Sequence, residues 1–379
     1  MEPGRLLAED VTEVTIMYQN FSILRSININ QRPRAHNSVP FFSTITHTMS
    51  TTSAPQSAEP AHASSWLAHF PITLFATVMG TTGLAIAWHK SAQVLAMPHG
   101  VGIGLSYVAL ALFVLLLLGY GAKALRYPGE LRAEFNHPVR ISFFPAISIS
   151  ALLLSIAFLH VQPVWSQAMW WGGITLHLVF TVVIMSSWIH HTHYQIQHST
   201  PAWFIPVVGN ILVPIAGMTH GSPEISWFFF SVGLVFWIVL LTVMMNRFFF
   251  HPPVPAKLLP TLFILIAPPA VGFLSYLALD GGVIDNFARV LFYVALFTTL
   301  LLFYQIPQFR KVPFFMSWWA YSFPLAAITI ASLTMGSKIG SGFLIGLGGA
   351  LLALTSALIA LLVVLTLKAI GDGKVFIPE

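Results

Sequence analysis

The sequence from residue 70 onward is a succession of apolar runs separated by short polar stretches. A run of about 20 apolar residues spans the hydrocarbon core of a bilayer as one helix, and an open irregular chain cannot satisfy its backbone in lipid. Only 8% of the 379 residues are charged and 56% are hydrophobic, so the chain cannot cover a water-facing globular surface. We therefore expect an all-α polytopic membrane protein in a lipid bilayer, and not an enzyme.

Ten runs define a predicted transmembrane domain over residues 70–368, followed by a cytoplasmic C-terminal tail over 369–379. The fifth run is the weakest, because it is short and interrupted by prolines and glycines. Residues 1–69 are rich in Ser, Thr and Pro and predict a disordered tail. Within it, Met49 resembles a natural translation start, so residues 1–48 need not be native. The ten runs are 70–89, 103–122, 141–160, 167–189, 203–219, 225–245, 259–278, 285–306, 316–335 and 341–368.

Basic residues in the connections predict the orientation. Ten Lys and Arg follow the even-numbered runs or lie in the C-terminal tail, whereas three follow the odd-numbered runs. By the positive-inside rule both termini are cytoplasmic, which requires an even number of helices. We expect a bacterial inner (plasma) membrane. The same loops explain the net charge of +5, so nucleic acid is not an expected partner.

Prolines mark an internal repeat. Every odd-numbered run contains at least one proline, and the interiors of the even-numbered runs contain none. This pattern predicts five hairpins, each of one kinked and one straight helix. Five such hairpins can close into a quasi-fivefold ring around a central pore, with the kinked helices inside. The alternative is a closed bundle in which the prolines are ordinary kinks.

The runs carry no ionisable group that could serve a cation. No Asp, Glu, Lys or Arg lies in the interior of a run, which argues against carboxylate-based proton coupling and against a cation pore. An anion could be drawn by the basic cytoplasmic mouth and held by neutral donors. The candidate donors are Thr73, Thr77, Ser142, Ser148, Ser150, Asn210, Ser322 and Thr329.

Histidines leave a metal or haem site as an alternative. The loop after the fourth run holds His190, His191, His193 and His198, and His177 lies inside that run. A membrane di-iron enzyme needs several such clusters, and a buried histidine is more often paired with a hydroxyl or carbonyl. We expect neither a metal nor a cofactor. The glycines between Gly336 and Gly349 predict close helix packing.

Three motifs carry a resemblance to a known family. They are His137-Pro-Val-Arg-Ile-Ser-Phe-Phe-Pro-Ala-Ile, Trp318-Trp-Ala-Tyr-Ser-Phe-Pro-Leu-Ala-Ala, and Phe70-Pro71 followed by Gly80. With these motifs in order, the chain resembles the tellurite-resistance/dicarboxylate transporter (TDT) family, which includes the slow anion channels of plant guard cells. The resemblance covers about residues 66–370, the whole predicted membrane domain.

The resemblance implies ten helices around a central pore, commonly assembled as a homotrimer. A phenylalanine on the ninth helix plugs the pore in that family, and Phe323 matches it. Phe144 is a second candidate for the pore wall, and Arg140 is a candidate for an anion-attracting mouth, although a snorkelling anchor explains Arg140 nearly as well. The expected pore lining also includes Pro71, Gly80, Pro145, Pro214, Pro268 and Pro324.

The expected function is passive transport of small inorganic or organic anions through a pore gated by Phe323. The alternative is a secondary carrier for dicarboxylate, sulfite or tellurite oxyanions. Were that carrier coupled to protons, a histidine such as His177 would have to bind the proton, because the runs offer no carboxylate.

Overall fold

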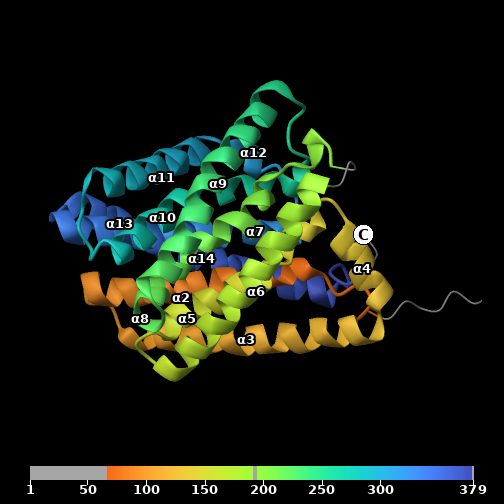
Figure 1. The fold of residues 1–379 in the computed structure, drawn as a ribbon, viewed down its shortest axis with the longest axis horizontal. Coiled ribbons are helices and arrows are strands. Elements are labelled where there is room, and N and C mark those ends of the chain that lie inside the picture. Colours follow the sequence, from red (N-terminus) through yellow and green to blue (C-terminus); the bar gives the residue numbers. More distant parts are fainter. Residues whose placement is uncertain (1–65, 191–193, 378–379) are drawn as a thin grey trace, which may run out of the picture. The chain divides into compact units, whose positions relative to one another are not determined.

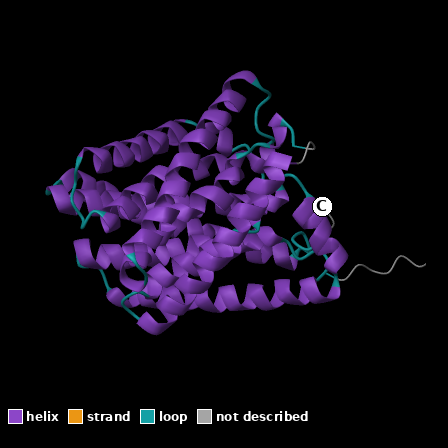
Figure 2. Cartoon of the chain, in the orientation of Figure 1, coloured by secondary structure: helices purple, strands orange, loops and turns teal. Residues whose placement is uncertain are grey.

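The computed structural model describes residues 66–190 and 194–377, which form helices and connecting loops without a strand (Figure 2). Nine helical spans in this part of the chain are long and apolar enough to cross a membrane. They are Ile72–Leu95, His99–Arg126, Arg140–Phe158, Pro163–His190, Pro201–His220, Pro223–Phe250, Ala256–Leu279, Asn286–Tyr304 and Gly342–Gly371. The expected tail over residues 1–69 lies almost entirely outside the described residues.

The nine spans fall on nine of the ten predicted runs. The remaining run, predicted over 316–335, is also helical: a 3₁₀ segment, η7 (Met316–Tyr321), leads into α13 (Ser322–Ile339). Its hydroxyls and Lys338 make α13 less apolar than the nine spans. Because α13 is buried along most of its length against α2 (Phe75–Leu95) and α14 (Gly342–Gly371), its polar groups need not face lipid.

Buried and exposed spans alternate along the chain. In the first, third, fifth and seventh spans, 67–78% of the most apolar window is buried, against 28–33% in the second, fourth, sixth, eighth and last. The first, third, fifth and seventh spans are therefore internal, and the other five face outward. Each internal helix packs against the outer helix that follows it (Figure 1). The pairs are α2 with α3 (His99–Arg126), α5 (Ala146–Phe158) with α6 (Pro163–His190), α8 (Val213–His220) with α9 (Pro223–Phe250), α10 (Ala267–Leu279) with α11 (Asn286–Tyr304), and α13 with α14.

Internal spans begin as 3₁₀ helix and continue as α-helix, and the predicted kinks are these junctions. The 3₁₀ segments are η1 (Ile72–Leu74), η2 (Arg140–Phe143), η4 (Pro201–Trp203), η5 (Gly209–Leu212), η6 (Ala256–Ile266) and η7, with a short α7 (Phe204–Val208) between η4 and η5. Pro145 is the N-cap of α5, and Pro214 and Pro268 each stand second in α8 and α10. Proline fits there because the first helical residues have no intrahelical acceptor for their N–H groups.

Internal contacts join the five internal helices to one another. Helix α2 packs against α5, α5 against α8, α8 against α10, α10 against α13, and α13 against α2. Gly348 on α14 shows why the predicted glycine stripe suits packing: a Cβ there would lie 2.7 Å from Leu333 of α13. The glycine thus permits close approach of the last two helices.

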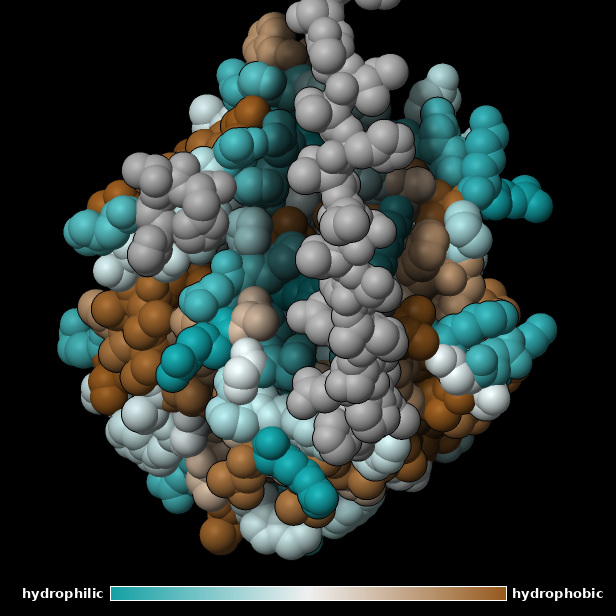
Figure 3. All heavy atoms as spheres, turned by 90° about the vertical axis from the view of Figure 1, so that its right-hand side faces the viewer, coloured by the Kyte–Doolittle hydropathy of each residue, from teal (hydrophilic) through white to brown (hydrophobic). Residues whose placement is uncertain are grey.

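The start and end of the described chain lie side by side. The Phe376 ring lies 5.6 Å from both the Trp66 ring and the Phe70 ring, measured between centroids. Helix α4 (Pro128–Asn136) lies at this end (Figure 1). Figure 3 looks onto it and shows hydrophilic residues gathered over the middle, with hydrophobic residues on the flanks. We call it the terminal end of the helical unit, and the opposite end the distal end.

A buried ion pair between Lys123 and Glu134 joins α4 to α3 at the terminal end. Glu134 of α4 accepts hydrogen bonds from Lys123 Nζ at 2.6 Å, Tyr120 Oη at 2.9 Å and the Ile72 backbone N–H at 3.0 Å. Lys123 also donates to the Phe70 carbonyl at 2.8 Å. Both charges are compensated, so the network ties α3 and α4 to the start of the first span. Removing one partner would leave the other charge buried alone.

Candidate functional site

Two cavities lie along the internal helices, and residues from all five internal spans line each of them. The first has a volume of about 80 Å³ and borders the beginnings of α5, α10 and α13. The second, of about 300 Å³, is lined by residues farther along the same helices. Three residues, Leu212, Val271 and Phe323, line both cavities and therefore lie at their boundary. The cavities thus follow one another toward the distal end.

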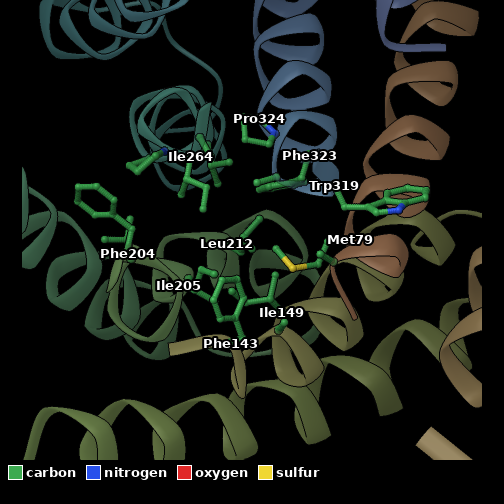
Figure 4. Close-up of a pocket in the computed structure, with 18 residues that line it drawn as sticks. Met79, Phe143, Ile149, Phe204, Ile205, Leu212, Ile264, Trp319, Phe323 and Pro324 are labelled. Atoms are coloured by element: carbon green, nitrogen blue, oxygen red, sulfur yellow. The ribbon is translucent and has the colours of Figure 1, made fainter. Parts of the chain in front are cut away.

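The first cavity has an apolar wall (Figure 4). None of the described side chains lining it carries a charge or a hydroxyl. Trp319 has the one side-chain N–H in this lining, and it donates to Thr366 Oγ1 at 2.9 Å. The lining residues are Ala76, Met79, Phe143, Ala146, Ile149, Phe204, Ile205, Val208, Gly209, Leu212, Ile264, Ala267, Pro268, Val271, Trp319, Ala320, Phe323 and Pro324.

Phe323 lies at the boundary of the two cavities. It follows the first residue of α13, and its half-buried ring extends from that helix into the first cavity (Figure 4). Its ring also packs closely against α2, where a Cβ on Gly83 would lie 3.1 Å from Phe323 Cδ2. A water-filled path between the two cavities would have to pass this ring.

The structure separates Phe144 from the other aromatic candidates. The Phe144 ring packs edge-on against Tyr120, Phe135 and Phe180 and lines neither cavity. Its neighbour Phe143 lines the first cavity instead. Both precede Pro145, and nothing in the sequence distinguishes them, because the 3₁₀ turn that decides which ring faces inward is not visible in the motif.

The other predicted lining residues divide into two groups. Pro268 and Pro324 line the first cavity. Pro71, Pro145, Pro214 and Gly80 line neither cavity. Gly80 instead lets α2 approach α13, because a Cβ there would overlap the Ser322 side chain.

Arg140 also lies away from both cavities. It is half-buried at the start of η2, where its backbone N–H donates to His137 Nδ1 at 3.3 Å. Its role at an anion-attracting mouth stays a prediction.

The expected neutral donors do not line either cavity, which corrects the sequence-based expectation. Most of them bond to carbonyls of their own helix: Thr77 to Leu74, Ser148 to Pro145, Ser150 to Ala146, Ser322 to Trp319 and Thr329 to Leu325. A buried hydroxyl without a partner is costly, and the carbonyl one turn earlier is always within reach. These five hydroxyls therefore bond to the backbone, whereas Ser142 Oγ and Asn210 Oδ1 are buried without a hydrogen-bond partner.

The metal alternative gains no geometric support. The described residues contain no group of three or more His, Asp and Glu side chains that could hold a metal ion. His191 and His193 lie outside the described residues. His177 is fully buried, and its Nδ1 lies 2.9 Å from Ser148 Oγ.

Comparisons with known proteins identify relatives of the membrane domain. Residues 69–367 match the SLAC1 family, described as voltage-dependent anion channels. The chain is 27% identical over 292 residues to the uncharacterized transporter MJ0576 of Methanocaldococcus jannaschii, covering 70% of this chain and 83% of that protein. It is 26% identical over 281 residues to the S-type anion channel SLAH2 of Arabidopsis thaliana, covering 72% of this chain and 54% of SLAH2. It is 25% identical over 311 residues to the tellurite resistance protein TehA homolog of Haemophilus influenzae, covering 81% of this chain and 93% of that protein.

Proposed function

The chain belongs to the SLAC1 family of voltage-dependent anion channels, and from this membership we propose that it conducts small anions passively through a central pore gated by Phe323. One observation carries the proposal. The two cavities are lined by all five internal spans and meet at the Phe323 ring. An apolar ring across such a path blocks an ion by excluding the water around it, and a rotation of the side chain would open the path.

Helix contacts support a ring of five hairpins. Each internal helix contacts the next in the order α2, α5, α8, α10 and α13, and α13 in turn contacts α2. This order of contacts is the one expected of a closed ring. Trp66 and Phe376 lie together at the terminal end, which fits an even number of crossings and hence a membrane crossing by α13. We propose ten crossings with both termini in the cytoplasm, where the basic residues of the connections are concentrated.

The distribution of charge favours an anion over a cation. A cation entering the first cavity would meet no carboxylate on any described lining residue. An anion loses its water there too, but the basic excess at one mouth raises its local concentration. We place Phe143 in the pore wall instead of Phe144. A homotrimer in a bacterial inner membrane remains our expectation from the family resemblance.

A coupled carrier is the second candidate. In that mechanism His177 would carry the proton, because it is a fully buried titratable side chain beside an internal helix. Its Nε2 has no hydrogen-bond partner and lies near Gly209, which lines the first cavity. His177 itself does not line either cavity, so a proton would need a path that opens during transport.

Ion substitution in planar bilayers tests the function. Purified full-length protein is reconstituted, and current is measured in gradients of chloride, nitrate, malate and sulfite, with protein-free bilayers as the control. A channel gives currents that reverse at the Nernst potential of the anion, and this reversal potential does not change with a pH gradient. A reversal potential that moves with the pH gradient supports the carrier. Currents that follow the cation gradient, or none with any anion, would contradict anion transport.

A further inference from the structure

The second cavity differs from the first in carrying positive charge. Lys90 of α2 and Lys338 of α13 both line it, whereas the rest of its described lining is apolar apart from Thr334 and Gly282. Both lysines lie near the distal ends of their helices. The pathway therefore passes from an apolar constriction at Phe323 into a wider space whose walls present two ammonium groups.

Lys338 reaches the rim of this space. A Cβ on Gly282, in the turn after α10, would lie 2.8 Å from Lys338 Nζ, so the amine rests against the glycine backbone. A side chain at this position would displace the amine. Lys90 is half-buried on the neighbouring helix α2 and lines the same cavity as Lys338. Two like charges held beside one cavity raise its positive potential.

Neither lysine forms an ion pair with a carboxylate within the described residues, including Asp280 in the turn before Gly282. The ion pairs there join Lys123 to Glu134 and Lys374 to Asp372. Asp285, near the same end, accepts hydrogen bonds from Tyr276 Oη at 2.6 Å and from the Ala288 N–H at 2.8 Å. The charge of the two amines therefore faces the cavity and the solvent beyond it.

We infer that Lys90 and Lys338 form an anion-binding vestibule at the distal end, holding a carboxylate or small inorganic anion before or after it passes Phe323. The inference rests on the proposed function and adds a binding site to it. The basic surplus of the connections lies toward the terminal end, and at the distal end Lys90 and Lys338 are the charged residues of the described cavity lining. Two amines on an otherwise apolar wall bind an anion weakly, which lets it leave toward the constriction.

The absence of cysteine from the chain permits a charge-reversal test. Lys90→Cys, Lys338→Cys and the double variant are made in a Phe323→Ala background to give measurable current. Arg289→Cys is the matched control, because Arg289 lies exposed near the distal end on α11 and lines neither cavity. Each cysteine is treated from the distal side with a methanethiosulfonate carrying either a trimethylammonium or a sulfonate group.

At about 10 mM chloride, we expect each lysine variant to lower conductance about twofold and the double variant to lower it about fourfold. At about 1 M chloride the effect should be small, because salt screens the charge. The cationic reagent should restore conductance and the anionic reagent should lower it further. The Arg289→Cys protein should change by much less under either reagent. Equal losses at both chloride concentrations, or the same response to both reagents, would overturn the vestibule.

Reaction rates give a readout that does not depend on conduction. With Lys338 present, the ratio of the anionic to the cationic reagent's rate should be higher for the thiol of the Lys90→Cys variant than for a small free thiol, as followed by intact-protein mass spectrometry. Adding Lys338→Gln should reduce this rate ratio about fourfold, because one removed charge changes the two rates in opposite directions. A ratio that does not change refutes the site. A protein that passes no anion yet keeps the rate preference would refute the proposed function and leave the vestibule standing.

Discussion

Truncation of Phe323 is the most direct perturbation of the proposed gate. The ring lies between cavities of about 80 Å³ and about 300 Å³, so Phe323→Ala joins them into one continuous space. Each lowering of the crossing barrier by about 1.4 kcal/mol raises the rate tenfold. Because the ring is the largest apolar group at the boundary, we expect anion conductance per protein to rise at least about tenfold.

Stability separates opening of a gate from loosening of the bundle. Truncating a fully buried phenylalanine costs about 3–5 kcal/mol. Phe323 already borders empty space on two sides, so its truncation should cost less than that. Phe144→Ala is the matched control, because the Phe144 ring is buried among three aromatic rings away from the cavities. This control should lose more thermal stability than Phe323→Ala and gain no conductance.

The assay is single-channel and macroscopic current in planar bilayers, normalised to the amount of incorporated protein, with thermal unfolding measured in the same detergent. Unchanged current in a folded Phe323→Ala protein would remove Phe323 from the gate. An equal gain in Phe144→Ala would show that general loosening, rather than an opened constriction, carries the current. Phe143→Ala, which enlarges the first cavity without removing the ring at the boundary, should give a smaller gain than Phe323→Ala.

Three further variants test the scaffold around the pathway. Glu134→Gln leaves the buried Lys123 ammonium without its counter-charge and should lower the free energy of unfolding by about 3–5 kcal/mol. Its control is Asp372→Asn, which removes an exposed ion pair and should not shift the thermal midpoint. Gly80→Val forces a side chain into Ser322 and should destabilise the protein by about 1–3 kcal/mol, whereas Gly104→Val, with open space around its Cβ, should be neutral in unfolding assays. The backbone N–H of Ala288 and the Tyr276 hydroxyl hold the pKa of Asp285 below its usual value. The resulting stabilisation is complete above the unfolded-state pKa of about 4 and is lost as the pH falls through the lower folded value. The thermal midpoint of Asp285→Asn should therefore fall less steeply than that of the unmodified protein in acid, and parallel curves would contradict this role.

Length and proline position predicted most of the architecture. Apolar runs located all of the long helices, because a lipid-crossing helix needs a minimum number of apolar residues whatever its tertiary contacts. Prolines identified the internal helices for a physical reason that the structure makes explicit: Pro145, Pro214 and Pro268 each stand where a 3₁₀ segment becomes α-helix. Such junctions recur on the buried helices, while the exposed helices run uninterrupted.

Side-chain direction within the site could not be predicted in the same way. Phe143 and Phe144 are neighbours of the same type, and the local turn geometry alone directs the first into the cavity and the second into an aromatic cluster. Hydroxyls posed a related problem. The sequence offers Ser148 and Thr329 as anion donors, but their own helices already bind them. Periodicity identifies which residues are internal, but it does not show which atoms remain unpaired there.

Charge placement along the pathway suggests how the protein distinguishes ions without binding them tightly. At the proposed constriction, no described lining side chain carries a charge or a hydroxyl, and Lys90 and Lys338 line the wider cavity beyond it. A charged residue at the constriction itself would hold an anion strongly and slow its exit. In the proposed pore, the positive potential of the lysines would select anions, while the apolar Phe323 ring would set the free-energy cost of removing water from the ion. Selectivity for the sign of the ion should then weaken as salt screens the lysines, whereas the gate should depend on the ring alone.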